Sequence, residues 1–132
     1  MNTLLDYQID VIGLKSGITA LDAGCGVCGP AVYFAQKTGC RIEAITISGV
    51  QAEKAREHIA KQGAGDRVNV REGDYHTLEQ YYPENSMDAV YFLESFGHAK
   101  SHEQALDSAW KVLKPGGVIY IKDLFIKKAA LK

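Results

Sequence analysis

Hydrophobic positions along the chain alternate between short β-branched runs and longer segments with helical spacing. The short runs predict five strands, at residues 18–22, 41–47, 68–71, 87–92 and 118–124. Apolar residues recur at helical spacing between them, and a short amphipathic helix through Leu5, Ile9 and Ile12 precedes Gly13. Strands that alternate with helices predict right-handed crossovers and a doubly wound parallel α/β sheet, with helices on both faces.

Serine and glutamine pairs mark the start of two helices. Ser48 with Gln51, and Ser101 with Gln104, both fit the S-x-x-Q pattern of a capping box. The second of these helices is expected to run through the apolar positions Leu106, Ala109, Trp110 and Leu113. The turn Lys-Pro-Gly-Gly at 114–117 leads into the last strand. With no linker, repeat or low-complexity tract, residues 1–132 are predicted to form one domain.

Composition narrows the class of protein. Hydrophobic residues make up 46% of the chain, charged residues 23%, and the formal net charge is −1. These values are typical of a soluble globular domain and give no electrostatic reason to expect nucleic acid or an anionic membrane as partner. No apolar run approaches the roughly 20 residues of a membrane span, and no targeting signal is visible, so a cytoplasmic location is expected. Three cysteines give neither a disulfide framework nor the four ligands of structural zinc, and no metal site is expected.

The strongest chemical signal is the turn Leu-Asp-Ala-Gly-Cys-Gly-Val-Cys-Gly at residues 21–29. Glycines between a first strand and its helix let a ligand approach bare backbone, and the helix N-terminus favours an anion. The same residues spell G-x-G-x-x-G, so an NAD(P)-dependent oxidoreductase core is one interpretation. Against it, Asp22 lies beside the place of a pyrophosphate, where a carboxylate suits a cationic ligand better.

Two further positions disfavour NAD. The end of the second predicted strand holds Thr46, where an NAD site needs an acidic residue for the ribose. Asp74 follows the third strand in Gly73-Asp74-Tyr75, where it could accept a hydrogen bond from an adenine amino group. The pattern therefore favours an adenine-containing ligand that carries a positive charge.

From residue 18 to residue 124 the sequence resembles the class I S-adenosylmethionine-dependent methyltransferases. The resemblance rests on the LDAGCGxxG turn, the GDY segment and the LKPGG turn, in order and at the expected intervals. Thr46, Ser48 and Gln51 give a Thr-x-Ser-x-x-Gln segment, as in a small-molecule subgroup related to sterol and geranyl diphosphate C-methyltransferases, cyclopropane fatty acid synthases and sugar O-methyltransferases. The resemblance implies a Rossmann-like fold, S-adenosylmethionine as cofactor, and methyl transfer to carbon or oxygen of a small organic acceptor.

The resemblance also implies a set of cofactor-binding residues. The glycines of the turn would line the methionine half, with Asp22 organising the turn or meeting the amino group through water. The Thr-x-Ser-x-x-Gln segment would surround the ribose and one adenine face, and Asp74 would bind the adenine amino group. Leu93 would present its backbone carbonyl to the methionine amino group. The full set is Asp22, Gly24, Cys25, Gly26, Thr46, Ile47, Gln51, Gly73, Asp74, Tyr75 and Leu93.

Catalytic groups are expected in the segment that follows the fourth strand, residues 93–98. If the acceptor is a hydroxyl or amine, a general base must take its proton, and His98 is the candidate. If the acceptor is an alkene, a carboxylate such as Glu94 could stabilise or deprotonate the carbocation. A module that binds cofactor without chemistry is a third interpretation. The other histidines, His58, His76 and His102, are expected at the surface.

The resemblance has a consequence for the last strand. Methyltransferases of this family continue with a helix and an antiparallel strand pair that complete a seven-stranded sheet, so the chain is interpreted as truncated after strand five. That strand is then expected to be an exposed edge, with Ile119, Ile121 and Leu124 poorly covered, and to pair with another copy in a homo-oligomer. Weak cofactor binding with little turnover is expected of this chain alone.

Overall fold

The computed structural model describes residues 3–123 and 127–131. Helices and strands alternate along them in the order α1 (Thr3–Ile12), β1 (Thr19–Ala23), α2 (Gly29–Thr38), β2 (Arg41–Thr46), α3 (Gly49–Lys61), β3 (Val68–Glu72), β4 (Met87–Leu93), α4 (His102–Val112), β5 (Leu113–Lys122) and β6 (Lys127–Leu131). Short 3-10 helices, η1 (Tyr75–Gln80) and η2 (Phe96–His98), follow β3 and β4. Within these ranges no helix is both long and apolar enough to cross a membrane.

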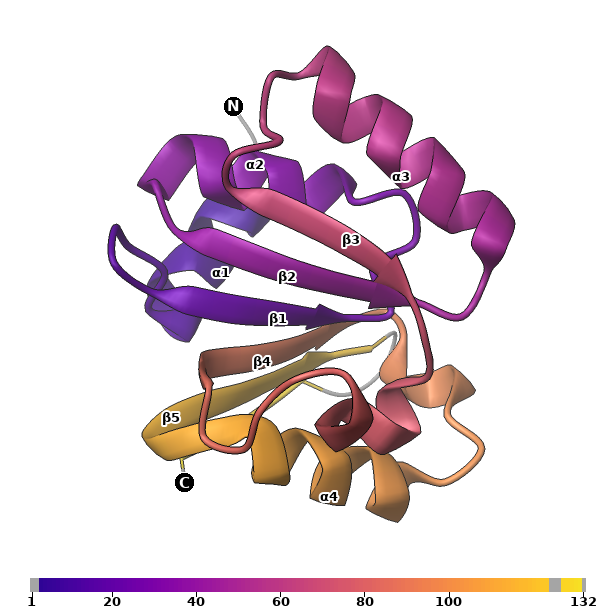
Figure 1. Ribbon diagram of the computed structural model, residues 1–132. Helices are drawn as coiled ribbons and strands as arrows, with labels where there is room; N and C mark the ends of the chain where they lie inside the picture. The colour runs from indigo at the N-terminus through magenta and orange to yellow at the C-terminus, as the bar shows by residue number, and fades with distance from the viewer. Residues whose placement is uncertain (1–2, 124–126, 132) are drawn as a thin grey trace.

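The strands form one sheet in the order β3-β2-β1-β4-β5-β6 (Figure 1). All neighbouring pairs from β3 to β5 are parallel, and β6 runs antiparallel to β5. The predicted doubly wound parallel sheet is therefore confirmed. Because the chain moves outward from β1 in both directions, the order reverses between β1 and β4. Ligands of such sheets bind at this reversal point, beyond the carboxyl ends of the strands.

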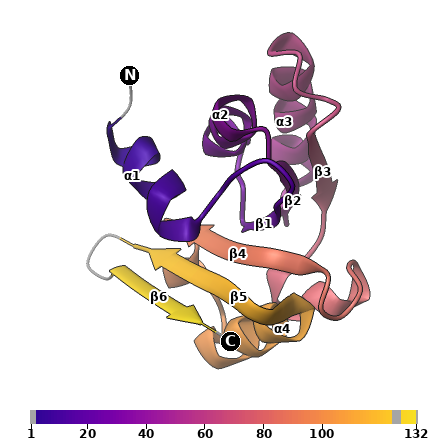
Figure 2. The same cartoon turned by 90° about the vertical axis from the view of Figure 1, so that its left-hand side faces the viewer.

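Helices cover both faces of the sheet (Figure 2). On one face α1, α2 and α3 bury apolar side chains such as Ile12, Phe34 and Ile59. On the other face α4 and η1 pack Val112 and Leu78 against the sheet. Parallel strands covered on both faces are apolar on both sides, which explains the continuous hydrophobic runs of the sequence.

Local signals placed the starts of two helices correctly, but they did not identify every buried face. The Ser48 hydroxyl accepts from the Gln51 N–H at 3.1 Å, and the Ser101 hydroxyl accepts from the Gln104 N–H at 3.1 Å. The expected apolar stripe of α4 is wrong in part, because its buried residues are Ala105, Ser108, Ala109 and Val112. Leu106 and Trp110 are 37% and 43% exposed. On this face the Ser108 hydroxyl accepts from the Leu78 N–H of η1 at 2.5 Å.

The last strands differ from the prediction. The expected Lys-Pro-Gly-Gly turn is an irregularity inside β5, where the register with β4 jumps from Met87↔Leu113 to Ala89↔Val118. Gly116 has φ +86°, the left-handed conformation that glycine adopts most easily. Leu124, the predicted end of this strand, lies outside the described residues.

The predicted open edge of β5 is wrong. β6 pairs with β5 along its length, with Ile119 opposite Ala130 and Ile121 opposite Lys128. An antiparallel partner only needs a short connection, so β6 can return directly without the helix that the resemblance implied. The edge on which the expected homo-oligomer depended is therefore occupied by the chain itself.

Candidate functional site

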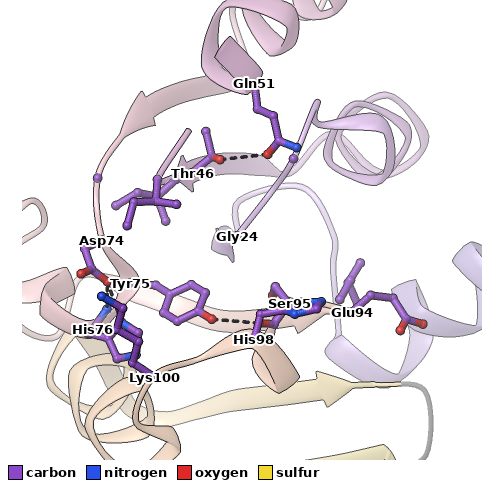
Figure 3. Close-up of a pocket in the computed structure, with 15 residues that line it drawn as sticks. Gly24, Thr46, Gln51, Asp74, Tyr75, His76, Glu94, Ser95, His98 and Lys100 are labelled. Carbon is purple, nitrogen blue, oxygen red and sulfur yellow. Dashed lines mark hydrogen bonds and ion pairs between the residues drawn. The ribbon is translucent and has the colours of Figure 1, made fainter. Parts of the chain in front are cut away.

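A cavity of about 490 Å³ lies at the carboxyl ends of β1 to β4, where the strand order reverses (Figure 3). Loops that follow four different strands contribute to its wall. The lining residues are Gly24, Gly26, Ile45, Thr46, Ile47, Gln51, Gly73, Asp74, Tyr75, His76, Leu93, Glu94, Ser95, His98 and Lys100.

The structure brings together nearly all of the site residues that the sequence indicated. Asp22 and Cys25 are the exceptions, because both are buried and neither lines the cavity. Sequence reasoning missed Ile45, His76, Ser95 and Lys100. Each of these residues lies within two positions of a predicted site residue. Closeness in sequence to those residues is the one signal that could have identified them. The expectation that His76 is a surface residue is wrong, since its side chain is only 13% exposed.

The glycine-rich turn crosses from β1 over the end of β2. The N–H groups of Gly24 and Cys25 both donate to the Ile45 carbonyl, at 2.9 and 3.0 Å. Gly24 has φ +86°, and a Cβ there would lie 2.6 Å from the Ser95 Cβ. At Gly26 (φ +57°) an added Cβ would meet no atom within 4 Å. Packing therefore requires glycine at the first position, whereas the second presents bare backbone to open space at the cavity.

Asp22 lies beneath this turn, at the end of β1. It is 3% exposed and sits beside Tyr91 of β4 in the sheet register. Burial raises the pKa of Asp22 to about 7, although the neighbouring Tyr91 hydroxyl partly opposes the rise. The carboxyl group does not line the cavity.

The end of β2 contributes a polar corner with one apolar side chain. The Thr46 hydroxyl donates to the Gln51 side-chain oxygen at 3.3 Å and accepts from the Ser48 N–H at 3.4 Å. Gln51 therefore bonds to the strand end and does not complete the capping box. Ile47 is 72% exposed beside these groups. The end of β2 thus carries a hydroxyl and an amide where an NAD site has a carboxylate.

Asp74 supplies the negative charge of the cavity on the β3 side. One carboxylate oxygen accepts from the His76 N–H at 2.9 Å and contacts His76 Nδ1 at 2.7 Å. Burial raises the pKa of Asp74, but the two bonds from His76 and the positive charge of Lys100 together hold it below its usual value. The carboxyl group thus stays ionised and can accept further hydrogen bonds.

Tyr75 and Ser95 connect the ends of three strands. The Tyr75 hydroxyl donates to the Ser95 carbonyl at 2.8 Å, and the Ser95 hydroxyl donates to the Ala23 carbonyl at 2.6 Å. Figure 3 shows the Tyr75 ring extending across the cavity toward Ser95. The loops after β3 and β4 are in this way tied to the glycine-rich turn.

The segment after β4 carries the two predicted catalytic residues. Glu94 has φ +63°, which is uncommon outside glycine, and its carboxylate pairs with Lys122 of β5. In Figure 3 this carboxylate points away from Tyr75. His98 is exposed in η2 on the same wall of the cavity. Of the two candidates, Glu94 is therefore held in an ion pair, whereas the His98 side chain is accessible to solvent.

Comparison with known proteins agrees with this geometry. Residues 21–121 match a family described as a methyltransferase domain. The chain is 38% identical over 112 residues to a sterol 24-C-methyltransferase of Gibberella zeae, which covers 85% of this chain and 29% of the relative.

Solved structures give the same result. The crystal structure of the 4+2 cyclase SpnF has a TM-score of 0.86 and 31% identity, covering 91% of this chain and 43% of that chain. A geranyl diphosphate methyltransferase in complex with S-adenosylmethionine has a TM-score of 0.81 and 26% identity, covering 89% and 47%. The chain thus spans less than half the length of these three proteins. It belongs to the methyltransferase domain family, as the glycine-rich turn, the GDY segment and the LKPGG turn indicated.

Proposed function

We propose that the chain binds S-adenosylmethionine in the cavity and that the protein transfers the methyl group to a small organic molecule. The observation that carries the proposal is one cavity, at the reversal point of the sheet, with bare glycine backbone on one side and the ionised Asp74 on the other. Relatives named for methylation of sterols and geranyl diphosphate support a small acceptor. The same proposal includes a cytoplasmic location and no nucleic-acid partner.

The residues of the cavity fit this cofactor chemically. Open space at Gly26 leaves room for the methionine portion against the backbone. Asp74 can accept a hydrogen bond from the adenine amino group, and Thr46 and Gln51 offer polar atoms to ribose hydroxyls. Ile47 can cover a face of the adenine ring with apolar surface. Leu93, at the end of β4, is proposed to present its carbonyl to the methionine amino group.

Bound S-adenosylmethionine would supply a methyl group on a positively charged sulfur, ready for direct displacement. The protein then has to align the acceptor with the methyl group and keep water out. The 93–100 segment is placed to do this, because it forms the wall of the cavity opposite the loop after β2. His98 would take the proton from a hydroxyl acceptor. With an alkene acceptor, Glu94 would stabilise or deprotonate the carbocation. Its negative charge is partly neutralised by Lys122.

Substitution of these two residues tests the function and separates the acceptor classes. In the whole protein, His98→Asn should lower kcat by roughly 100-fold or more for a hydroxyl acceptor, because a general base contributes about that much. Glu94→Gln should cause the larger loss if the acceptor is an alkene. Turnover is measured with methyl-labelled S-adenosylmethionine, and S-adenosylhomocysteine affinity is measured alongside. His58→Asn, on α3 and outside the cavity lining, is the matched control. If neither substitution lowers kcat more than this control does, both roles are lost.

A second candidate is cofactor binding without methyl transfer. Two observations favour it: a similar solved structure is named as a cyclase, and Glu94 is engaged by Lys122. In this case the whole protein binds S-adenosylhomocysteine but releases no labelled methyl group to any acceptor tested. Methyl transfer to one acceptor would exclude it.

A further inference from the structure

His76 contacts two loops that both contribute residues to the cavity. Its Nδ1 lies 2.7 Å from the Asp74 carboxylate, in the loop after β3. Its Nε2 lies 3.3 Å from the backbone nitrogen of Ser101, which caps α4 and ends the loop that carries His98 and Lys100. Nothing in the proposed function uses His76, although it lines the cavity.

These two contacts indicate which ring nitrogen donates and which accepts. A backbone N–H can only donate, so Nε2 must accept the hydrogen bond from Ser101 with its lone pair. The remaining proton is then on Nδ1, where it donates to Asp74. The two contacts together therefore match the Nδ1–H tautomer. An Nε2–H would point at the Ser101 N–H and break the contact.

Further bonds hold the ring in place between the loops. The His76 N–H donates to the same Asp74 oxygen at 2.9 Å, and the Gln104 side chain of α4 donates to the His76 carbonyl at 3.5 Å. The Tyr75 ring lies beside the imidazole, with centroids 4.9 Å apart. The imidazole thus contacts both Asp74 and the residue that caps α4.

We infer that His76 is a positioning residue that couples a ligand at Asp74 to the placement of the 95–101 loop. The inference rests on the proposed function, in which Asp74 meets the adenine of the cofactor. A ligand that hydrogen-bonds Asp74 fixes its carboxylate, the carboxylate fixes the imidazole, and the imidazole fixes Ser101. Cofactor binding would thus order the wall that meets the acceptor.

The first test needs no ligand. Long-range ¹H–¹⁵N NMR of the chain at neutral pH distinguishes a protonated from an unprotonated ring nitrogen. The inference predicts that His76 is protonated at Nδ1 and bare at Nε2. A His76 ring that carries its proton on Nε2, or on both nitrogens, would overturn it, whether or not the chain binds a cofactor.

The second test separates the two contacts. In His76→Asn the side-chain amide can replace Nδ1 at Asp74 but cannot reach Ser101, whereas in His76→Gln the side-chain oxygen can replace Nε2 only. Each chain is ¹⁵N-labelled and titrated with S-adenosylhomocysteine while the amides of Ser101 and His102, which do not line the cavity, are followed. His58→Asn, on α3 and away from the cavity, is the matched control.

Wild type and the control should show ligand-dependent shifts of both amides. H76Q should bind about tenfold more weakly, the cost of a hydrogen bond to a charged group, and H76N should lose less affinity. The two amides should no longer respond in H76N at saturation. Unchanged responses in saturated H76N would overturn the coupling. If the wild-type chain does not bind S-adenosylhomocysteine, both the proposed function and the coupling are overturned. The NMR measurement on the ligand-free chain tests the His76 contacts independently of cofactor binding, so the two failures can be told apart.

Discussion

Gly24→Ala should lower the free energy of unfolding by roughly 2 to 4 kcal/mol, the combined cost of a left-handed non-glycine residue and an overpacked core. The added Cβ would lie 2.6 Å from the Ser95 Cβ and 3.3 Å from Cε2 of Tyr75, at φ +86°. Ser95 and Tyr75 are hydrogen-bonded to each other, so the methyl group fits only if both move. Urea unfolding followed by circular dichroism measures the change.

Two other glycines are controls for the same substitution. Gly26 and Gly63 have φ +57° and +67°, and an added Cβ at either would meet nothing within 4 Å. Alanine at each should cost only about 1 kcal/mol, from backbone strain alone. Gly26→Ala should also weaken S-adenosylhomocysteine binding, because Gly26 lines the cavity and Gly63 does not. Equal losses of stability at Gly24 and Gly63 would contradict the packing argument.

Asp22→Asn should stabilise the chain at pH 8. Burial raises the pKa of Asp22 from 3.8 to about 7, so the unfolded chain releases this proton at lower pH than the folded chain does. The Asp22 contribution to stability therefore falls as pH rises from about 4 to 7 and then levels off. Each pKa unit corresponds to about 1.4 kcal/mol, and the pKa of Asp22 rises by about three units. The gain in the free energy of unfolding therefore has an upper limit of roughly 4 kcal/mol.

Unfolding curves of wild type and Asp22→Asn at several pH values test this. The advantage of the variant should vanish below about pH 3, where the wild-type carboxyl group is protonated in both the folded and the unfolded chain. Asp10→Asn, at an exposed position of α1, is the matched control and should not change the pH dependence. If Asp22→Asn is less stable than wild type at pH 8, the carboxylate is held by favourable interactions and the burial argument fails.

Local sequence patterns, such as hydrophobic periodicity and helix-capping residues, predicted most of the fold. Alternating strand and helix patterns gave the parallel sheet, and the serines at positions 48 and 101 gave two helix starts that the hydrogen bonds confirm. The glycine-rich turn and Asp74 lie at the cavity for the same reason, since each directly follows a strand whose carboxyl end faces the ligand side.

Contacts between distant residues could not be predicted in this way. The bond of His76 to Ser101, the pairing of Glu94 with Lys122 and the covering of β5 by β6 all depend on how the loops meet in space. The exposure of Trp110 has a similar cause, because the packing of α4 against η1 and the sheet decides which face of the helix is buried.

Isothermal titration of the chain with S-adenosylhomocysteine, with NAD as the control ligand, tests the central claim most directly. The residues of the cavity predict saturable binding of S-adenosylhomocysteine with a stoichiometry of about one, and no binding of NAD. Gly26→Ala in the same titration should weaken the binding and so assign it to this cavity. Binding of NAD alone, or binding of S-adenosylhomocysteine that Gly26→Ala leaves unchanged, would contradict the proposed function.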